Sequence, residues 1–187
     1  MSRTCSFGQG RSRPGAEALG ESSADAATRG LRARVRAGRP PAAALRPPDL
    51  RQILASSGRH AANDIKDFKT SETANSCSYT PFGEGGVINA AAYRAFLLTS
   101  ASQVLGNDDY WKIAERNLNF VLENQNADGS WLYAVDGVRD FVDHYHTCFV
   151  MKALAKMNTL TGHVGTLEAL ERGVAYYLKN LFAVDGL

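Results

Sequence analysis

The sequence predicts an all-α domain of helical hairpins that follows a disordered basic tail. From residue 87 onward, apolar residues recur three or four positions apart, and Gly and Asn interrupt them at regular breaks. One helix-and-loop pattern also recurs 56 residues further along the chain. Strand-like alternation of apolar and polar residues is absent, so we expect no strands.

The expected tail comprises residues 1–48, and the expected domain comprises residues 49–187. Ala, Arg, Gly, Pro and Ser supply 35 of the first 48 residues, which contain one of the chain's 17 aromatic residues. Such a segment buries too little apolar surface to offset its ordering entropy. Residues 1–50 carry a net charge of +5 and residues 51–187 a net charge of −3. An Arg-rich tail can touch nucleic acid or anionic membranes without specificity. A linker, or read-through of a start site, is the favoured interpretation, and we expect no specific nucleic-acid partner.

The first half of the domain predicts a short helix, a loop and then a longer helix. Leu50, Ile53 and Leu54 indicate the short helix, and a loop follows through residues 79–81. Gly85-Gly86 precede a segment whose apolar stripe runs from Val87 to about Ser102. The segment ends near Gly106-Asn107, where turn-forming residues interrupt it.

The second half predicts three more helices. Asp108 is the expected N-cap of the first, which ends in the turn-forming run of residues 124–129. A polar loop with Trp131 and Tyr133 follows. Asp140 or Asp143 then caps a helix that reaches about Thr161. The last helix runs from about residues 165–166 to residue 182.

A repeat relates two of these helices. The segment 116–121 is followed by Asp128-Gly129, and the similar segment 172–177 is followed by Asp185-Gly186. Each hairpin of such a repeat has an apolar face that a neighbouring hairpin must cover. We therefore expect the chain to be a fragment whose C-terminal hairpins are missing, or to have a homo-oligomer partner.

Targeting and redox signals are sparse. No apolar run reaches the length of a transmembrane helix, and the N-terminus lacks the apolar core of a secretory signal. The three cysteines, Cys5, Cys77 and Cys148, are odd in number and far apart, which implies no disulfide framework. We therefore expect a cytoplasmic protein with no transmembrane segment.

The segment 116–131 resembles the glutamine–tryptophan motif of the terpenoid-cyclase and prenyltransferase type of α/α toroid. Phe120-Val121, Gln125, Gly129 and Trp131 match that motif, and Asn117 departs from its usual Gly or Ala. In that family the Gln caps a helix end and stacks on the Trp, so the motif joins hairpins and carries no chemistry. The aspartate-rich motif of squalene-type cyclases and the zinc ligands of protein prenyltransferases are both absent from the sequence.

Further landmarks resemble the VpsJ-like toroid proteins that are encoded with bacterial polysaccharide-biosynthesis genes. In order, they are Tyr79-Thr80-Pro81, Asn89-Ala90-Ala91, the segment 128–133 and the segment 141–147. The resemblance covers residues 75–187. It implies a partial α/α toroid, about half of a full ring, that acts in surface or exopolysaccharide biosynthesis on a glycan or glycolipid substrate.

The densest polar cluster lies between residues 131 and 147. In the predicted helix, Asp143 shares one face with apolar residues and His146 lies at its edge. A carboxylate beside an imidazole can tune proton transfer near neutral pH. We assign Asp143 and His146 as a catalytic proton-transfer pair with Tyr133 as an auxiliary. The candidate substrate-binding residues are Trp131, as an aromatic floor for a sugar face, and Asp136, Arg139, Asp140 and His144.

Each assignment has a structural alternative. An N-cap role for Asp140 or Asp143 would satisfy backbone N–H groups, and Trp131 is more simply explained by packing between hairpins. His146 could be a buried hydrogen-bonded residue, and Arg139 could pair with Asp136 or Asp143. A zinc site from His144, His146 and Cys148 is disfavoured because a helix turns His146 away from the other two. We expect no metal and no cofactor.

Three functions remain open. The first is a carbohydrate-linked toroid, which as an enzyme would be a hydrolase or lyase. The second is a cyclase-like or prenyltransferase-like enzyme acting on an isoprenoid or lipid carrier, and the third is a non-catalytic helical-repeat binding module. A glycan cavity should be lined by a mixture of acids and aromatic rings, whereas an isoprenoid cavity should be lined almost wholly by aromatic rings.

Overall fold

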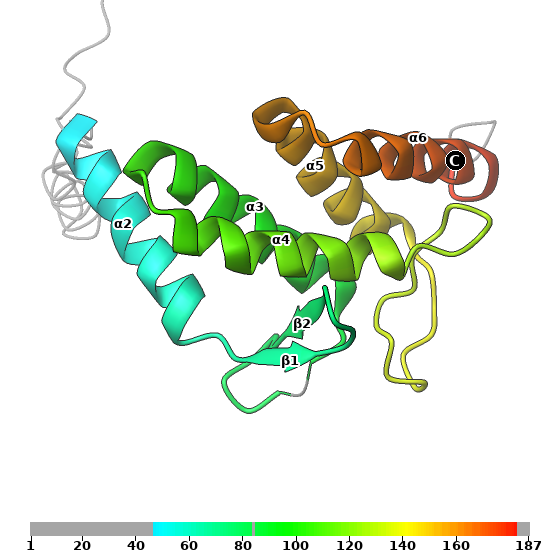
Figure 1. Ribbon diagram of the computed structural model, residues 1–187. Helices are drawn as coiled ribbons and strands as arrows, with labels where there is room; N and C mark the ends of the chain where they lie inside the picture. Colours follow the sequence, from blue (N-terminus) through cyan, green and yellow to red (C-terminus); the bar gives the residue numbers. More distant parts are fainter. Residues whose placement is uncertain (1–46, 84, 183–187) are drawn as a thin grey trace, which may run out of the picture. The chain divides into compact units, whose positions relative to one another are not determined.

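The computed structural model describes residues 47–83 and 85–182, where the chain forms five α-helices and one small β-hairpin (Figure 1). In order, these are α2 (Pro47–Asn63), β1 (Asp67–Lys69), β2 (Asn75–Cys77), α3 (Ile88–Leu105), α4 (Asp108–Glu123), α5 (His144–Thr161) and α6 (Val164–Asn180). This predominance of helix confirms the predicted fold class. The expected tail lies outside the described residues, except for Pro47 and Pro48, which begin α2.

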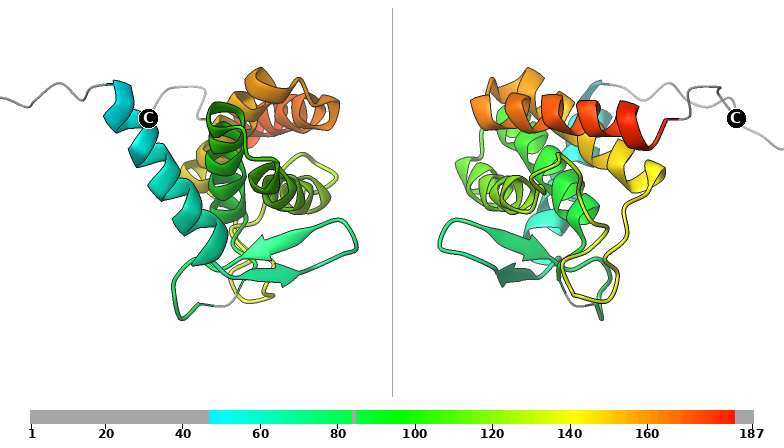
Figure 2. Two further views of the ribbon diagram at one scale, coloured as in Figure 1. Left: turned by 60° about the vertical axis from the view of Figure 1, so that its left-hand side comes forward. Right: turned by 90° about the vertical axis from the view of Figure 1, so that its right-hand side faces the viewer.

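Consecutive helices pack as hairpins, as the sequence predicted. α3 contacts its hairpin partner α4 and also α2 and α5, while α5 contacts its own partner α6. α3 and α5 are therefore neighbours, and their hairpin partners α4 and α6 also contact each other (Figures 1 and 2). Gly106 and Gly162 end α3 and α5 in the left-handed conformation, and their N–H groups donate to carbonyls four residues back.

The structure shows which residues are the N-caps of α4 and α5. The N-cap of α5 is Asp143, not Asp140, because the Asp143 side chain accepts a hydrogen bond from the N–H of His146. The expected N-cap of α4, Asp108, is wrong by one residue. Asn107 caps that helix by accepting from the N–H of Asp109 at 3.0 Å. Asp108 instead lies in the first turn, where the helix dipole favours an acidic side chain.

The expectation that strands are absent is wrong for residues 67–77. β1 and β2 pair antiparallel with Phe68 opposite Ser76. Each strand has only three residues, which is too short for alternation to stand out in the sequence. The preceding helix α2 is also longer than the short helix that the sequence predicted.

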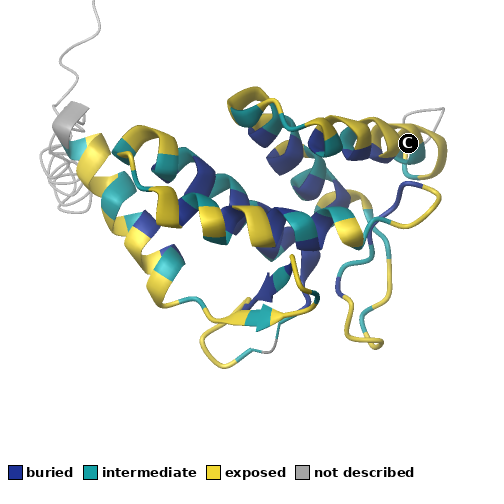
Figure 3. Cartoon of the chain, viewed as in Figure 1, coloured by how far each residue is buried: buried dark blue, intermediate teal, exposed yellow. Residues whose placement is uncertain are grey.

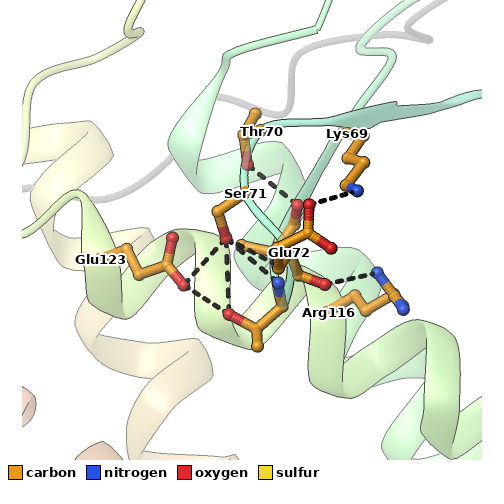
Figure 4. A network of polar contacts seen from close by, with 8 residues as sticks. Lys69, Thr70, Ser71, Glu72, Arg116 and Glu123 are labelled. Carbon is orange, nitrogen blue, oxygen red and sulfur yellow. Dashed lines mark hydrogen bonds and ion pairs between the residues drawn. The ribbon is translucent and has the colours of Figure 1, made fainter.

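Side chains of α4 hold the hairpin in place. The Asn117 amide donates to the carbonyl of Asn75 at 2.8 Å, and this contact accounts for the departure from the usual Gly or Ala. At the hairpin turn, the hydroxyls of Ser71 and Thr73 donate to the Glu123 carboxylate at 3.2 and 2.9 Å (Figure 4). The pairing is thus supported by tertiary contacts that its few strand residues do not provide.

The core lies where α3, α4 and α5 meet (Figure 3). Its largest fully buried side chains include Phe120, Leu118, Leu154 and Met157. The predicted inward face of α5 is confirmed, because Thr147, Val150, Leu154 and Met157 are all buried. Burial of such side chains supplies about 1.5–3 kcal/mol each, so α5 is fixed against α3 along its length.

The glutamine–tryptophan motif joins α4 to α6, which confirms its predicted hairpin-joining role. Nε2 of Gln125 donates to the carbonyl of Gly129 at 2.9 Å and to that of Ala169 in α6 at 2.8 Å. The indole N–H of Trp131 donates to the carbonyl of Val121 at 3.0 Å. The bond from Gln125 to Ala169 links the α3–α4 hairpin to the α5–α6 hairpin, and the other two fix the loop to the end of α4.

The first parts of the predicted repeat occupy equivalent places. Arg116 lies in α4 and Arg172 lies in α6, each the second helix of its hairpin. The second Asp-Gly loop, at residues 185–186, lies outside the described residues. In the described part of the chain, no helix is long and apolar enough to cross a membrane.

Candidate functional site

Asp143 and His146 form the closest carboxylate–imidazole contact of the predicted cluster. Oδ1 of Asp143 accepts from the backbone N–H of His146 at 2.8 Å, and Oδ2 lies 2.5 Å from Nδ1 of its ring. Both side chains are about a third exposed or less. Asp143 therefore has two roles that the sequence treated as alternatives, because it caps α5 and also holds an imidazole.

The electrostatics of this pair set its proton positions. Burial raises the pKa of Asp143, but the hydrogen bonds and positive charge that His146 provides outweigh burial and leave the pKa below its usual value. The carboxylate is then ionised at neutral pH and accepts a hydrogen bond from Nδ1–H. In the neutral form of the ring, Nε2 of His146 consequently bears the lone pair that could accept a proton from a ligand or water.

Tyr133 lies directly against the imidazole. Its ring meets that of His146 edge-on, with centroids 4.4 Å apart, and stacks on Phe141 at 5.1 Å. The segment is fixed to the start of α3, since the carbonyl of Tyr133 accepts from the N–H of Ile88 and the N–H of Val135 donates to Gly86. The loop that contains Tyr133 therefore contacts the N-terminal ends of both α3 and α5, and these three segments form the rim of the cluster.

Asp136 and Arg139 bind each other rather than Asp143. Their side chains form an ion pair of 2.6 Å, and Asp136 also accepts from the N–H groups of Val138 and Arg139. These backbone bonds, followed by the Arg139 side chain, lower the pKa of Asp136 to about 2. The guanidinium lies 5.3 Å from the Tyr133 ring, so it reaches the rim of the cluster. The exposed Asp140 lies in the same loop.

Trp131 and His144 lie away from the pair. Trp131 is 2% exposed and packs against α6, where a Cβ on Gly173 would lie 2.5 Å from the indole ring. Its assignment as the floor for a sugar is therefore wrong, since neither ring face is open. Nδ1 of His144 contacts the Tyr177 hydroxyl of α6 at 2.8 Å, on a different side of α5 from His146.

Among the described residues, no group of three or more His, Cys, Asp and Glu is placed to hold a metal ion. His146 is bound to Asp143, whereas Cys148 interacts with Tyr177 on the side of α5 that carries His144. Cys77 is buried, and this burial raises the pKa of its thiol to about 11. Cys5 lies outside the described residues.

A run of aromatic rings extends the site in a way that the sequence did not predict. Tyr145 meets His146 edge-on at 5.2 Å and Phe149 at 4.3 Å, and Phe149 in turn meets Tyr93 of α3 at 5.3 Å. Burial raises the pKa of Tyr93, and the neighbouring Tyr145 raises it further. Helical spacing could not reveal this run, because it depends on which faces of α3 and α5 meet.

The run leads into a groove of about 580 Å³ on α3. Its lining comes from α2, the loop between α2 and β1, α3, α5 and the residues at and after the end of β2: Ala61, Ile65, Cys77, Ser78, Tyr79, Asn89, Ala90, Tyr93, Arg94, Phe96, Leu97 and Phe149. This lining is mainly apolar and contains no acidic side chain. Neither Asp143 nor His146 belongs to it, so the groove and the pair are neighbouring features joined by the aromatic run.

Comparison with known proteins identifies the fold and no family. No family model and no curated protein matches the sequence. Among solved structures, the chain is similar to an unsaturated glucuronyl hydrolase from Bacillus sp. GL1, described as responsible for the degradation of glycosaminoglycan, with 13% identity and a TM-score of 0.52. A UGL structure named with dGlcA-Glc-Rha-Glc matches with the same values.

The similarity covers 72% of this chain and 41% of each of those chains. The chain therefore spans less than half the length of the solved structures that it matches. At this identity the likeness concerns the fold, and it supports the α/α-toroid class that the sequence predicted.

Proposed function

We propose that the chain binds a glycan against the surface formed by His146, Tyr133 and Phe141, and that it processes this glycan by proton transfer. The 2.5 Å contact between Asp143 and His146 carries the proposal. An ionised carboxylate at Nδ1 leaves Nε2 as the proton acceptor, and the hydroxyl of Tyr133 can assist as donor or acceptor. The flat faces of nearby aromatic rings suit the apolar faces of sugars.

The proposed reaction is that of a hydrolase or a lyase, with no cofactor. In a hydrolase, His146 would take a proton from the attacking water while the glycosidic C–O bond breaks and the Tyr133 hydroxyl gives a proton to the departing sugar oxygen. In a lyase, His146 would take a proton from a sugar carbon, a C=C bond would form, and the departing sugar oxygen would again take its proton from Tyr133. Arg139 and the exposed Asp140 lie in the same loop as Tyr133 and are proposed to contact the substrate. Asp136 would orient Arg139.

The test compares glycan turnover by the unaltered chain with that of His146→Gln and Asp143→Asn. A panel of neutral and uronic-acid oligosaccharides serves as substrate, and new reducing ends or a conjugated double bond distinguishes hydrolysis from elimination. We expect at least a hundredfold loss in both variants with unchanged helicity. The control is His60→Gln, which alters an exposed imidazole in a similar contact with Asp64. Equal turnover by all four proteins would exclude Asp143 and His146 as the proton-transfer pair.

A role in surface or exopolysaccharide biosynthesis, as in VpsJ-like proteins, is the biological setting that we propose, with a cytoplasmic location. Exchange of Asp143 or His146 for Ala in the producing cell should stop polysaccharide output while the protein remains folded. Loss of the folded protein would mean that these residues are structural.

One observation favours a second candidate, an enzyme acting on an isoprenoid or lipid carrier. The groove on α3 has a mainly apolar lining without acids, and its aromatic rings are of the kind expected in an isoprenoid cavity: Tyr79, Tyr93, Phe96 and Phe149. The third function, a non-catalytic binding module, is supported by the N-cap role of Asp143. Turnover of an oligosaccharide that depends on His146 would exclude this third function.

Missing C-terminal hairpins or a second copy of the chain remain the proposed partners of the repeat. Val164, Leu178 and Phe182 are more than half exposed on and just after α6, where the repeat predicts a neighbouring hairpin. Light scattering of the 187-residue chain should therefore give a dimer or larger assembly unless further hairpins are supplied.

A further inference from the structure

The groove on α3 differs in character from one end to the other. Its lining residues on that helix run from Asn89 to Leu97, which spans about 12 Å at the helical rise of 1.5 Å per residue. The lining also holds the hydroxyl groups of Ser78 and Tyr79 and the guanidinium of Arg94, which is bound to protein partners. At the Leu97 end, Ala61 and Ile65 belong to the same apolar cluster as Leu97. A ligand that fills the groove would therefore have one polar and one hydrocarbon end.

Asn89 marks the polar end with an unused acceptor. The residue is only 8% exposed, and its Oδ1 has no hydrogen-bond partner among the described residues. A buried amide oxygen without a partner costs about 1–3 kcal/mol. A ligand hydroxyl donated to this oxygen would recover that cost, so the position selects for a ligand with a hydroxyl at this point.

The polar end also faces the proposed reaction site. Asn89 follows Ile88, whose N–H donates to the carbonyl of Tyr133, the residue that packs on His146. From the groove, Phe149 and Tyr145 continue the aromatic surface to the same imidazole. A ligand that extends beyond Asn89 therefore has a continuous path to His146.

We propose that the substrate is an amphipathic glycan, with its hydrocarbon chain in the groove and its saccharide against His146 and Tyr133. This inference rests on the proposed function for the saccharide part. A bare saccharide would leave the Leu97 end of the groove without polar partners. A hydrocarbon alone would leave Oδ1 of Asn89 without a donor and would not contact Asp143 and His146. A molecule with both parts satisfies both ends.

The experiment titrates the full chain with methyl, hexyl and octyl β-D-glucopyranoside, each below its aggregation concentration, while NMR follows side-chain signals. We expect the dissociation constant to fall two- to fourfold for each added methylene group. The methyl signals of Ala90, Leu97 and Ile65 should shift with hexyl and octyl glucoside and not with methyl glucoside. The ring signals of His146 and Tyr133 should shift with all three probes.

Two variants on α3 provide a matched comparison. Ala90→Trp places a large side chain in the groove and should abolish the dependence on chain length while methyl glucoside still binds. Val104→Trp makes a similar change at a half-exposed position outside the groove and should leave binding unchanged. The titration of the unaltered chain decides the matter even if Ala90→Trp does not fold.

Several results would overturn the inference. Equal affinity for the three probes, with shifts confined to His146 and Tyr133, would leave the proposed function intact and exclude a chain in the groove. Absence of any binding, or shifts at Val164 and Leu178 alone, would also overturn it. Concentration-dependent shifts of Ala90 and Leu97 without ligand would identify a second copy as the occupant. Shifts at the groove without any at His146 would instead contradict the proposed function.

Discussion

Gln125 donates a 2.8 Å hydrogen bond to the backbone carbonyl of Ala169, 44 residues further along the chain. The same Nε2 also donates to Gly129 in its own loop. One carboxamide thereby fixes the loop after α4 and attaches it to α6. The α3–α4 and α5–α6 hairpins follow one another in the sequence. This hydrogen bond joins the loop after the first hairpin to the last helix of the second.

Gln125→Ala should lower the free energy of unfolding by about 1–3 kcal/mol, since two carbonyls lose their donor at a half-buried position. The control is Gln103→Ala, which removes a bond of equal length to Leu160 at an exposed position. It should cost less than about 1 kcal/mol, because water replaces the lost donor. Chemical denaturation measures both, and equal losses would contradict the joining role of Gln125.

Gly129→Ala should destabilise the chain more than Gly137→Ala does. Both glycines have positive φ values, +93° and +72°, at which a side chain costs about 1–2 kcal/mol. Only at Gly129 would the added Cβ also lie 2.4 Å from the carbonyl oxygen of Arg172, whereas nothing lies within 4 Å at Gly137. The difference in melting temperature between the two variants isolates the close approach of the loop to α6. If the two variants melt together, the loop and α6 are not in tight contact.

Arg94→Met should be among the most destabilising changes in the chain. The guanidinium is 3% exposed and donates to the carbonyls of Ala61 and Ile65 and to the Asp67 carboxylate, which fixes the end of α2 and β1 to α3. Loss of one partner of a buried ion pair costs about 3–5 kcal/mol, and partial exposure of Asp67 favours the lower value.

The control for that change is Arg116→Met, which removes a single long bond to the carbonyl of Glu72 at the surface. Its unfolding free energy should stay within about 0.5 kcal/mol of the unaltered chain. Urea denaturation followed by circular dichroism compares the two variants. A loss of under 1 kcal/mol for Arg94→Met would show that the α2 end and hairpin are held by other contacts.

The stability of the chain should depend on the ionisation of Asp143. Because its pKa in the folded chain lies below the ordinary value of 3.8, this group contributes stability above that value and loses it as the pH falls through the folded pKa. Asp143→Asn keeps an N-cap but removes this contribution, so its stability should fall less steeply below pH 4. The control, Asp64→Asn, alters an exposed carboxylate beside His60 and should retain the pH profile.

The same variant tests the proton position on His146. Nitrogen NMR at neutral pH should find the proton of the neutral ring on Nδ1 in the unaltered chain, since the ionised Asp143 accepts a hydrogen bond from Nδ1–H. In Asp143→Asn, the proton should move toward Nε2. An Nε2–H ring in the unaltered chain would contradict the proposed role of Nε2 as proton acceptor.

Helix positions and their ends could be predicted from local signals. Gly106, Gly162 and Asp143 mark ends that backbone chemistry fixes, since a left-handed residue or a capping oxygen satisfies groups that the helix leaves unpaired. The joining role of Gln125 followed from a motif whose spacing is itself structural. The β-hairpin did not follow, because Asn117 and Glu123 of α4 supply the bonds that hold it.

The candidate site, too, was predictable only where it depends on residues close together in the sequence. Asp143 and His146 lie three residues apart on one helix start, so local geometry brings them together whatever surrounds them. Trp131 was misassigned because burial depends on α6, which approaches it from 42 residues away at Gly173. Asn89 and Tyr93 of α3 had no sequence signal that linked them to Phe149, since Phe149 comes from a different helix, α5.

By itself, the sequence determined the approximate positions of the helices from α3 onward and the contact between Asp143 and His146, because these depend on backbone geometry within a few residues. The structure was needed to identify the N-cap residues of α4 and α5. Only the tertiary structure decided which faces of α3 and α5 meet, that Trp131 is buried, and that a groove opens beside the pair. The burial of apolar surface is non-directional, so the spacing of apolar residues in the sequence does not specify which helices pack together. The packing of separate helices therefore decides where a groove remains on the surface.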